Sequence, residues 1–276
     1  MKTVLTIYAG VLGQPGLLLR LGGLMMIILV IYQIALTLLL DSLYVPGNQG
    51  QTQQAFFDNW PRLVLGFVVY GVIIVWLTTI FAIRWHRYVL LGQKKYSVLD
   101  VTFAGREWRF VWNSIVIALI IGLAMVVFFV AVRIVFSLVA AISPSLFIFL
   151  NFAALVVLLL FVNYFVGRFC LVFPATALGV PMRVRDSWHK TWDGGIRVML
   201  LLTAMSLPNL IAPEVAFYLL QPGTVPAWLA TAVGTFVQVF FLLITTALYA
   251  STFSYTYRDL GLPLEPPRYP VPDAQV

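Results

Sequence analysis

Two long stretches of this chain contain no charged side chain, and this feature constrains the fold more than any other. No Asp, Glu, Lys or Arg lies between Ile134 and Gly167, or between Val215 and Tyr257. A helix that crosses a bilayer needs about 20 apolar residues, and a charge at its centre costs about 2.5–3.5 kcal/mol. Charged residues make up 10% of the chain, against about 25% in a soluble domain. We therefore expect an integral membrane protein.

Apolar blocks of spanning length occur repeatedly, and they predict helices. In lipid each backbone N–H and C=O needs an internal partner, so only helices and closed barrels cross a membrane. Barrel strands are about 10 residues long and alternate in polarity, whereas these blocks are longer and do not alternate. We expect an all-α fold, a polytopic membrane helix bundle with six transmembrane helices. The predicted spans are Leu21–Leu40, Pro61–Ile83, Phe110–Val132, Leu146–Val166, Arg197–Ala212 and Ala227–Tyr249.

The third and fifth predicted spans are irregular. The third apolar block continues past Arg133 to Ile142, which is longer than an untilted span, so Arg133 is expected to extend its charge to the interface. The Ser143-Pro144-Ser145 turn then reverses the chain. The fifth span carries Pro208, which predicts a kink. Residues Glu214–Pro226 are expected to form the loop that follows it.

The distribution of lysine and arginine predicts the orientation. If the N-terminus is cytoplasmic, all of the 17 Lys and Arg residues except Arg62 and Arg133 fall in cytoplasmic segments. Cytoplasmic loops of membrane proteins carry such an excess of Lys and Arg. Both termini are therefore expected in the cytoplasm. The same rule explains the net charge of +7 without a nucleic-acid partner.

The predicted cytoplasmic segments show helical spacing. One apolar stripe consists of Val184, Trp188, Trp192, Ile196 and Met199. On the opposite face, Asp186–Lys190 and Asp193–Arg197 are i,i+4 pairs with the acid first, which is the favourable order. This pattern indicates an amphipathic helix that lies in the interface. Similar stripes are formed by Tyr96, Leu99, Phe103 and Phe110, and by Val4, Ile7, Tyr8, Val11 and Leu12.

The chain thus divides into three predicted repeat units, each an interfacial helix followed by a two-span hairpin. The units cover residues 1–92, 93–179 and 180–262 of a single transmembrane domain, 1–262. In each unit one arginine enters the first span, another follows the end of the second span, and a glycine comes after that second arginine. These residues are Arg20, Arg109 and Arg197, then Arg84, Arg168 and Arg258, and finally Gly92, Gly179 and Gly261. Residues 263–276 are proline-rich and predict an extended, disordered tail.

The segments that follow the second and fourth predicted spans resemble those of a known protein family. These segments are Arg84-Trp85-His86-Arg87-Tyr88-Val89-Leu90-Leu91-Gly92 and Arg168-Phe169-Cys170-Leu171-Val172-Phe173-Pro174-Ala175. They resemble those of bacterial six-span proteins, namely the YciC-like proteins and the membrane domain attached to some glycerophosphoryl diester phosphodiesterases. The pattern Ser187-Trp188, Thr191 and Gly194 is similar to their interfacial helix. The resemblance implies a bacterial inner-membrane protein of undefined biochemistry and transfers no active-site residue, and the phosphodiesterase domain is absent from this sequence.

No motif in the sequence indicates catalysis. Cys170 is the single cysteine, and the two histidines, His86 and His189, lack the further ligands that a metal site needs. Neither a G-x-x-x-x-G-K-[ST] phosphate-binding loop nor a G-x-S-x-G nucleophile motif is present. Asp186 and Asp193 are better explained by their helical partners than by acid–base chemistry. We expect a non-enzymatic protein without metal or cofactor.

The candidate functional residues are polar groups inside the spans and basic groups at their ends. Intramembrane polar residues often mark functional sites, but here we interpret them mainly as interhelical hydrogen-bonding groups, with a polar solute cavity as the alternative. They are Gln33, Asn151, Asn163 and Gln238. Basic groups near a headgroup layer attract anionic lipid, although the positive-inside rule alone would also place them there. The candidate anionic-lipid contacts are Arg84, His86, Arg87, Arg168, Arg183, Arg185 and Lys190.

Two classes of function fit this pattern. The leading hypothesis is a membrane component that acts through membrane lipids, including anionic ones, or through a membrane-protein partner or a second copy of the chain. The alternative is a small-solute transporter or permease-like subunit, because many transporters have internal repeats. The absence of charged residues within the spans argues against the alternative.

Overall fold

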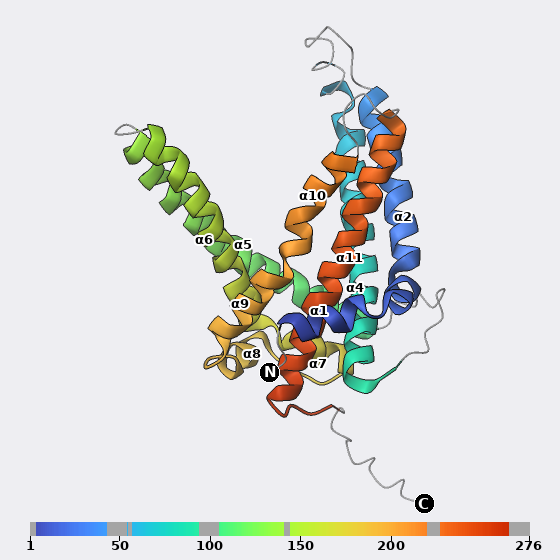
Figure 1. The fold of residues 1–276 in the computed structure, drawn as a ribbon, viewed down its shortest axis with the longest axis vertical. Coiled ribbons are helices and arrows are strands. Elements are labelled where there is room, and N and C mark those ends of the chain that lie inside the picture. The colour runs from blue at the N-terminus through green and yellow to red at the C-terminus, as the bar shows by residue number, and fades with distance from the viewer. Residues whose placement is uncertain are drawn as a thin grey trace, which may run out of the picture.

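The computed structural model describes residues 4–42, 54, 57–93, 105–140, 144–219 and 227–264. Within these ranges the regular elements are helices (Figure 1). Six helical stretches are long and apolar enough to cross a membrane: Pro15–Leu36, Trp60–Leu91, Gly105–Phe136, Ala153–Leu178, Gly195–Ala216 and Ala232–Asp259. The predicted all-α fold with six spanning helices is confirmed, and the chain is a multi-pass integral membrane protein.

The helices follow one another along the chain with short breaks. In order they are α1 (Val4–Leu12), α2 (Pro15–Ser42), α4 (Trp60–Leu91), α5 (Gly105–Ala140), α6 (Pro144–Phe169), α7 (Val172–Leu178), α8 (Val184–Lys190), α9 (Gly195–Met205), α10 (Leu207–Leu219) and α11 (Ala227–Asp259). Pro144 begins α6, where its missing N–H needs no helical partner. Pro144 and Ser145, which the sequence placed in a reversing turn, therefore belong to α6, and Ser143 lies outside the described residues.

The most central helix is α11, which packs against α1, α2, α4, α7, α9 and α10 (Figure 1). It approaches α2 closely, because a Cβ placed on Gly22 would lie 2.8 Å from Cδ2 of Leu243. The core between these helices includes Leu29, Phe81, Trp85, Leu243 and Leu248. In contrast, α5 and α6 form a hairpin that leans away from this bundle and joins it at one end through α4, α7, α8 and α9 (Figure 1).

A glycine in the left-handed conformation follows α4, α7 and α11. Gly92, Gly179 and Gly261 have φ values of 69°, 78° and 63°. A residue with a side chain pays about 1–2 kcal/mol in this conformation, so glycine is the usual residue after a helix end of this kind. These are the three glycines that the predicted repeat places after the second arginine of each unit. The repeat as a whole stays a prediction.

The fifth span is broken where the sequence predicted a kink. The break lies at Ser206, between α9 and α10. Pro208 falls in the first turn of α10, where a missing N–H is tolerated, so it begins the second half and does not bend a continuous helix. The helix then continues to Leu219. The predicted loop is consequently wrong for residues Glu214–Leu219, which are helical.

The predicted amphipathic helix before the fifth span is also divided. Helix α8 ends at Lys190, residues 191–194 form a turn, and α9 begins at Gly195. The predicted stripe therefore does not share one face, and Trp192 and Ile196 are 67% and 68% exposed. The pairs Asp186–Lys190 and Asp193–Arg197 form no ion pair in the described part of the chain; Asp186 instead accepts a hydrogen bond from the Arg183 N–H at 3.2 Å. The similar stripe at Tyr96–Phe103 lies outside the described residues.

Candidate functional site

A cavity of about 550 Å³ opens where the first turns of α5 meet the end of α7 and the start of α8. We call this end of the bundle, where α4 ends and α5 begins, the basic end. The polar groups that line the cavity are Arg106, Arg109, Asn113, Thr176, Arg183 and Asp186. Three arginines and one aspartate give the lining a formal charge of +2. The cavity is therefore suited to an anion.

Helical spacing and a tight turn bring these groups together. Arg106, Arg109 and Asn113 are separated by three and four residues, so they lie on one face of α5. On the opposite side, the left-handed Gly179 ends α7 and redirects the chain. Arg183 then lies across the cavity from α5, directly before α8.

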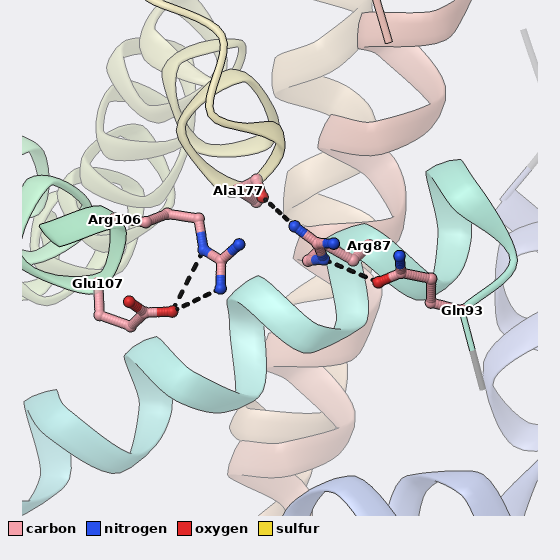
Figure 2. A network of polar contacts seen from close by, with 5 residues as sticks. All are labelled: Arg87, Gln93, Arg106, Glu107 and Ala177. Carbon is pink, nitrogen blue, oxygen red and sulfur yellow. Dashed lines mark hydrogen bonds and ion pairs between the residues drawn. The ribbon is translucent and has the colours of Figure 1, made fainter. Parts of the chain in front are cut away.

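Two arginines at the basic end are held by the protein itself. Arg106 forms an ion pair with Glu107, with Nη2 2.9 Å from Oε1. Arg87 on α4 donates to Oε1 of Gln93 at 2.9 Å and to the Ala177 carbonyl at 3.5 Å. Figure 2 shows both guanidinium groups beside the end of α7, where the helix dipole is negative and favours a cation. These contacts orient Arg87 and Arg106 and reduce the charge that they offer to a ligand.

Arg109 and Arg183 make fewer polar contacts with the protein than Arg87 and Arg106 do. Both are exposed, and within the described ranges neither guanidinium group has a hydrogen-bond or ion-pair partner. Trp112 lines the cavity one turn beyond Arg109 and is 58% exposed. Aromatic residues of this kind gather at the membrane–water interface. The cavity thus lies at the end of a spanning helix, beside an exposed tryptophan.

The arginine that follows the fourth span has a different environment. Arg168 is 1% exposed, and its guanidinium carbon lies 4.5 Å from the Trp188 ring centroid and 4.8 Å from that of Trp192. Its Nη1 donates to the Thr191 carbonyl at 2.7 Å. Attraction to the two ring faces compensates for part of the cost of burying the charge. Arg168 is therefore an internal cation that fastens α8 to α6.

Hydroxyl groups complete this attachment. Ser187 Oγ donates to the Arg168 carbonyl at 2.9 Å, and Thr191 Oγ1 lies 3.0 Å from the same carbonyl and 2.8 Å from the Ser187 carbonyl. The Leu171 N–H donates to Ser187 Oγ at 3.3 Å. At Gly195 an added Cβ would lie 3.1 Å from Cδ of Arg168. The residues Ser187, Trp188 and Thr191, which the sequence placed in an interfacial pattern, thus act together around Arg168.

The structure separates the predicted lipid contacts into two groups. Arg84 and His86 are buried like Arg168, and the His86 ring Nδ1 lies 2.8 Å from Ser254 Oγ. These three side chains are packed inside the protein and are not retained as lipid contacts. Arg183, Arg185 and Lys190 are exposed, and Arg87 is half-buried. Lipid binding by the exposed residues stays a prediction.

The intramembrane polar residues also differ in their surroundings. Asn163 is 2% exposed; its Nδ2 donates to Thr203 Oγ1 at 3.2 Å, and its Oδ1 accepts from the Tyr249 hydroxyl at 3.0 Å. It therefore links α6, α9 and α11, as the interhelical interpretation predicts. Gln33 is half-buried and Gln238 is exposed. The side chain of Asn151 lies outside the described residues.

In the sequence, Arg106 and Arg109 served to orient the chain, and Arg109 also marked a repeat unit, but their place in a cavity was not predicted. The signal available was the spacing of Arg106, Arg109 and Asn113 at the start of a span. Their partners across the cavity depend on the turn at Gly179, which helical periodicity does not reveal. Only the tertiary contact between α7 and α5 shows which residues face Arg106 and Arg109 across the cavity.

Comparison with known proteins gives no relative. No protein-family model, curated protein or solved structure matches the chain. The resemblance to the YciC-like proteins and to the phosphodiesterase membrane domain therefore stays an expectation. Within the described residues, no group of three or more His, Cys, Asp and Glu side chains could hold a metal ion.

Proposed function

We propose that this integral membrane protein binds the phosphate group of anionic lipid headgroups in the cavity at its basic end. The observation that carries the proposal is the pair Arg109 and Arg183, which line one cavity from two different segments. Their guanidinium groups have no partner among the described residues. Binding, and not chemistry, is the proposed activity.

Electrostatics and geometry support a phosphate ligand. A basic residue near an anionic leaflet contributes about 1 kcal/mol of attraction. Arginine adds directionality, because its planar group can donate two parallel hydrogen bonds to phosphate oxygens. Two arginines on opposite sides of the cavity could therefore hold one phosphate between them. The volume of about 550 Å³ is within the usual range of small-ligand sites.

The surface next to the cavity favours a lipid over a free phosphate ion. Beyond Trp112, the exposed apolar residues Ile115, Leu119 and Leu123 follow one another at helical spacing along α5. This stripe leads from the cavity toward the middle of the span. An acyl chain could lie along it while the headgroup occupies the cavity. We also propose that the basic end faces the cytoplasm of a bacterial inner membrane, which the charge distribution supports.

The transporter alternative gains no specific support. A solute pathway through this bundle would need polar groups that are open to the solute. The amide of Asn163 is instead occupied by Thr203 and Tyr249. We therefore keep lipid binding as the single proposed function.

The test compares two double variants that remove the same charge. Arg109→Gln/Arg183→Gln changes the cavity, and Arg185→Gln/Lys190→Gln changes exposed residues of α8 that do not line it. Each protein is purified in mild detergent, and its retained phosphatidylglycerol and cardiolipin are measured by mass spectrometry. The cavity variant is expected to lose most of this lipid, and the α8 variant to keep most of it. Equal retention in all three proteins would refute the proposal.

A second arm separates lipid from soluble phosphate. Wild-type protein stripped of lipid is titrated with inorganic phosphate, and separately with phosphatidylglycerol in mixed micelles. Thermal stabilisation by the lipid at concentrations where phosphate has no effect is the expected result. Stabilisation by phosphate alone would contradict lipid binding.

A further inference from the structure

The orientation of the Asn113 amide follows from the hydrogen bonds at the cavity wall. Asn113 Nδ2 donates to Thr176 Oγ1 at 3.1 Å, and Thr176 Oγ1 donates to the Val172 carbonyl at 2.7 Å. A hydroxyl has a single hydrogen, so Thr176 can only accept from Asn113. The Asn113 nitrogen must therefore point toward α7. A reversed amide would accept from Thr176 only if the hydroxyl gave up its hydrogen bond to the Val172 carbonyl.

The amide oxygen is consequently the group that Asn113 can offer to a ligand. No described residue donates to Asn113 Oδ1, and an amide oxygen can accept two hydrogen bonds. The arginines of the cavity only donate. The cavity thus combines cationic donors for phosphate oxygens with a neutral acceptor, one helical turn beyond Arg109.

The charge of the cavity determines which kind of ligand group would donate a hydrogen bond to Asn113 Oδ1. Three arginines and one aspartate line the cavity, and one oxygen of Asp186 already accepts from the Arg183 N–H. A ligand ammonium group would enter a site with a net positive charge, and this disfavours it. A neutral hydroxyl group meets no such repulsion. The acceptor therefore favours a headgroup with a hydroxyl over one with an amine.

We infer that the cavity recognises a phosphodiester headgroup that carries a free hydroxyl, of the phosphatidylglycerol type. Arg109 and Arg183 bind the phosphate, and Asn113 Oδ1 accepts a hydrogen bond from the hydroxyl of the headgroup. Asn113 is thus the residue that determines specificity, and Thr176 fixes its orientation. The inference rests on the proposed function, because it needs a lipid phosphate in the cavity.

The experiment uses two lipids of equal charge. Phosphatidylglycerol and phosphatidylmethanol with identical acyl chains are both monoanionic phosphodiesters, and only the first has headgroup hydroxyls. Delipidated protein is offered an equal mixture in detergent, and bound lipid is counted by native mass spectrometry. The wild type is expected to prefer phosphatidylglycerol about 2- to 10-fold, the contribution of one net hydrogen bond.

Three variants make the result decisive. Asn113→Ala is expected to bind both lipids equally, and its thermal unfolding shows whether it is folded. Gln238→Ala removes an exposed amide on α11, away from the cavity, and is expected to keep the preference. Equal binding by the wild type, or an unchanged preference in Asn113→Ala, would overturn the inference. If Arg109→Gln/Arg183→Gln binds both lipids normally, the proposed function itself fails.

Discussion

The guanidinium carbon of Arg168 lies 4.5 Å from the centre of the Trp188 ring, in a position that solvent hardly reaches. Trp192 covers the group at 4.8 Å, and Nη1 donates to the Thr191 carbonyl. A planar cation can satisfy all three contacts at once. The attachment of α8 to α6 therefore depends on the shape of the arginine as well as on its charge.

Arg168→Lys is expected to destabilise the protein although it preserves the charge. A lysine ammonium cannot lie flat against Trp188 and Trp192 while it reaches the Thr191 carbonyl. Loss of the cation–π contacts at a desolvated site should cost about 2 kcal/mol. The thermal unfolding midpoint of the detergent-solubilised protein measures the change. The control is Arg185→Lys on the exposed face of α8, which should leave the midpoint unchanged.

Gly195→Ala is expected to loosen the same attachment by steric conflict. The new Cβ would lie 3.1 Å from Cδ and 3.2 Å from Nη1 of Arg168. Overpacking of this kind costs about 1–3 kcal/mol. The neighbouring Gly194→Ala serves as the control, because nothing lies within 4 Å of its added Cβ. If both variants unfold at the wild-type temperature, Gly195 does not limit the packing here.

Gly179→Ala should destabilise the turn that forms one side of the cavity. Its φ of 78° costs a residue with a side chain about 1–2 kcal/mol. Gly122 lies within α5 with open space around it, so Gly122→Ala should be neutral or stabilise by up to about 1 kcal/mol. Chemical denaturation of the two variants beside the wild type gives the comparison. Opposite signs for the two alanines are expected, and equal effects would contradict this account of the turn.

Asn163→Leu should reduce stability modestly without affecting lipid selectivity. The side chain joins three helices through Thr203 and Tyr249. Hydrogen bonds between helices in membranes contribute about 0.6 kcal/mol on average, so a loss of about 1 kcal/mol is expected from two of them. Thermal unfolding and the two-lipid competition are measured on the same preparation. A change in lipid preference would indicate that the cavity and this hydrogen-bonded group are coupled.

The orientation of the chain is tested with a reporter fused after Val276. A reporter that is active only in the periplasm should remain inactive, because the basic end is proposed to face the cytoplasm. A fusion within the segment that precedes α4, after Gly50, should be active. The reverse pattern would place the basic cavity on the outer face.

The spans were predictable because they depend on local composition, whereas the surroundings of the arginines were not. Uncharged blocks of spanning length fix where helices cross a membrane, whatever their neighbours are. In the sequence, Arg168 and Arg183 are both arginines of predicted cytoplasmic segments. In the structure, Trp188 and Trp192 enclose Arg168, whereas Arg183 lines a cavity. That difference arises from contacts between segments far apart in the chain. A count of basic residues at span ends therefore does not distinguish an enclosed arginine from one that lines a cavity.

The close approach of α2 and α11 has a consequence for how the protein is made. Gly22 and Leu243 lie on the first and last spans, so the contact between them waits until the ribosome has produced the final helix. Until then the face of α2 that carries Leu29 lacks its α11 partner and must be covered by lipid or by a membrane insertase. The bundle therefore closes after synthesis of α11, and a chain that stops before Ala227 would leave this core open in the membrane.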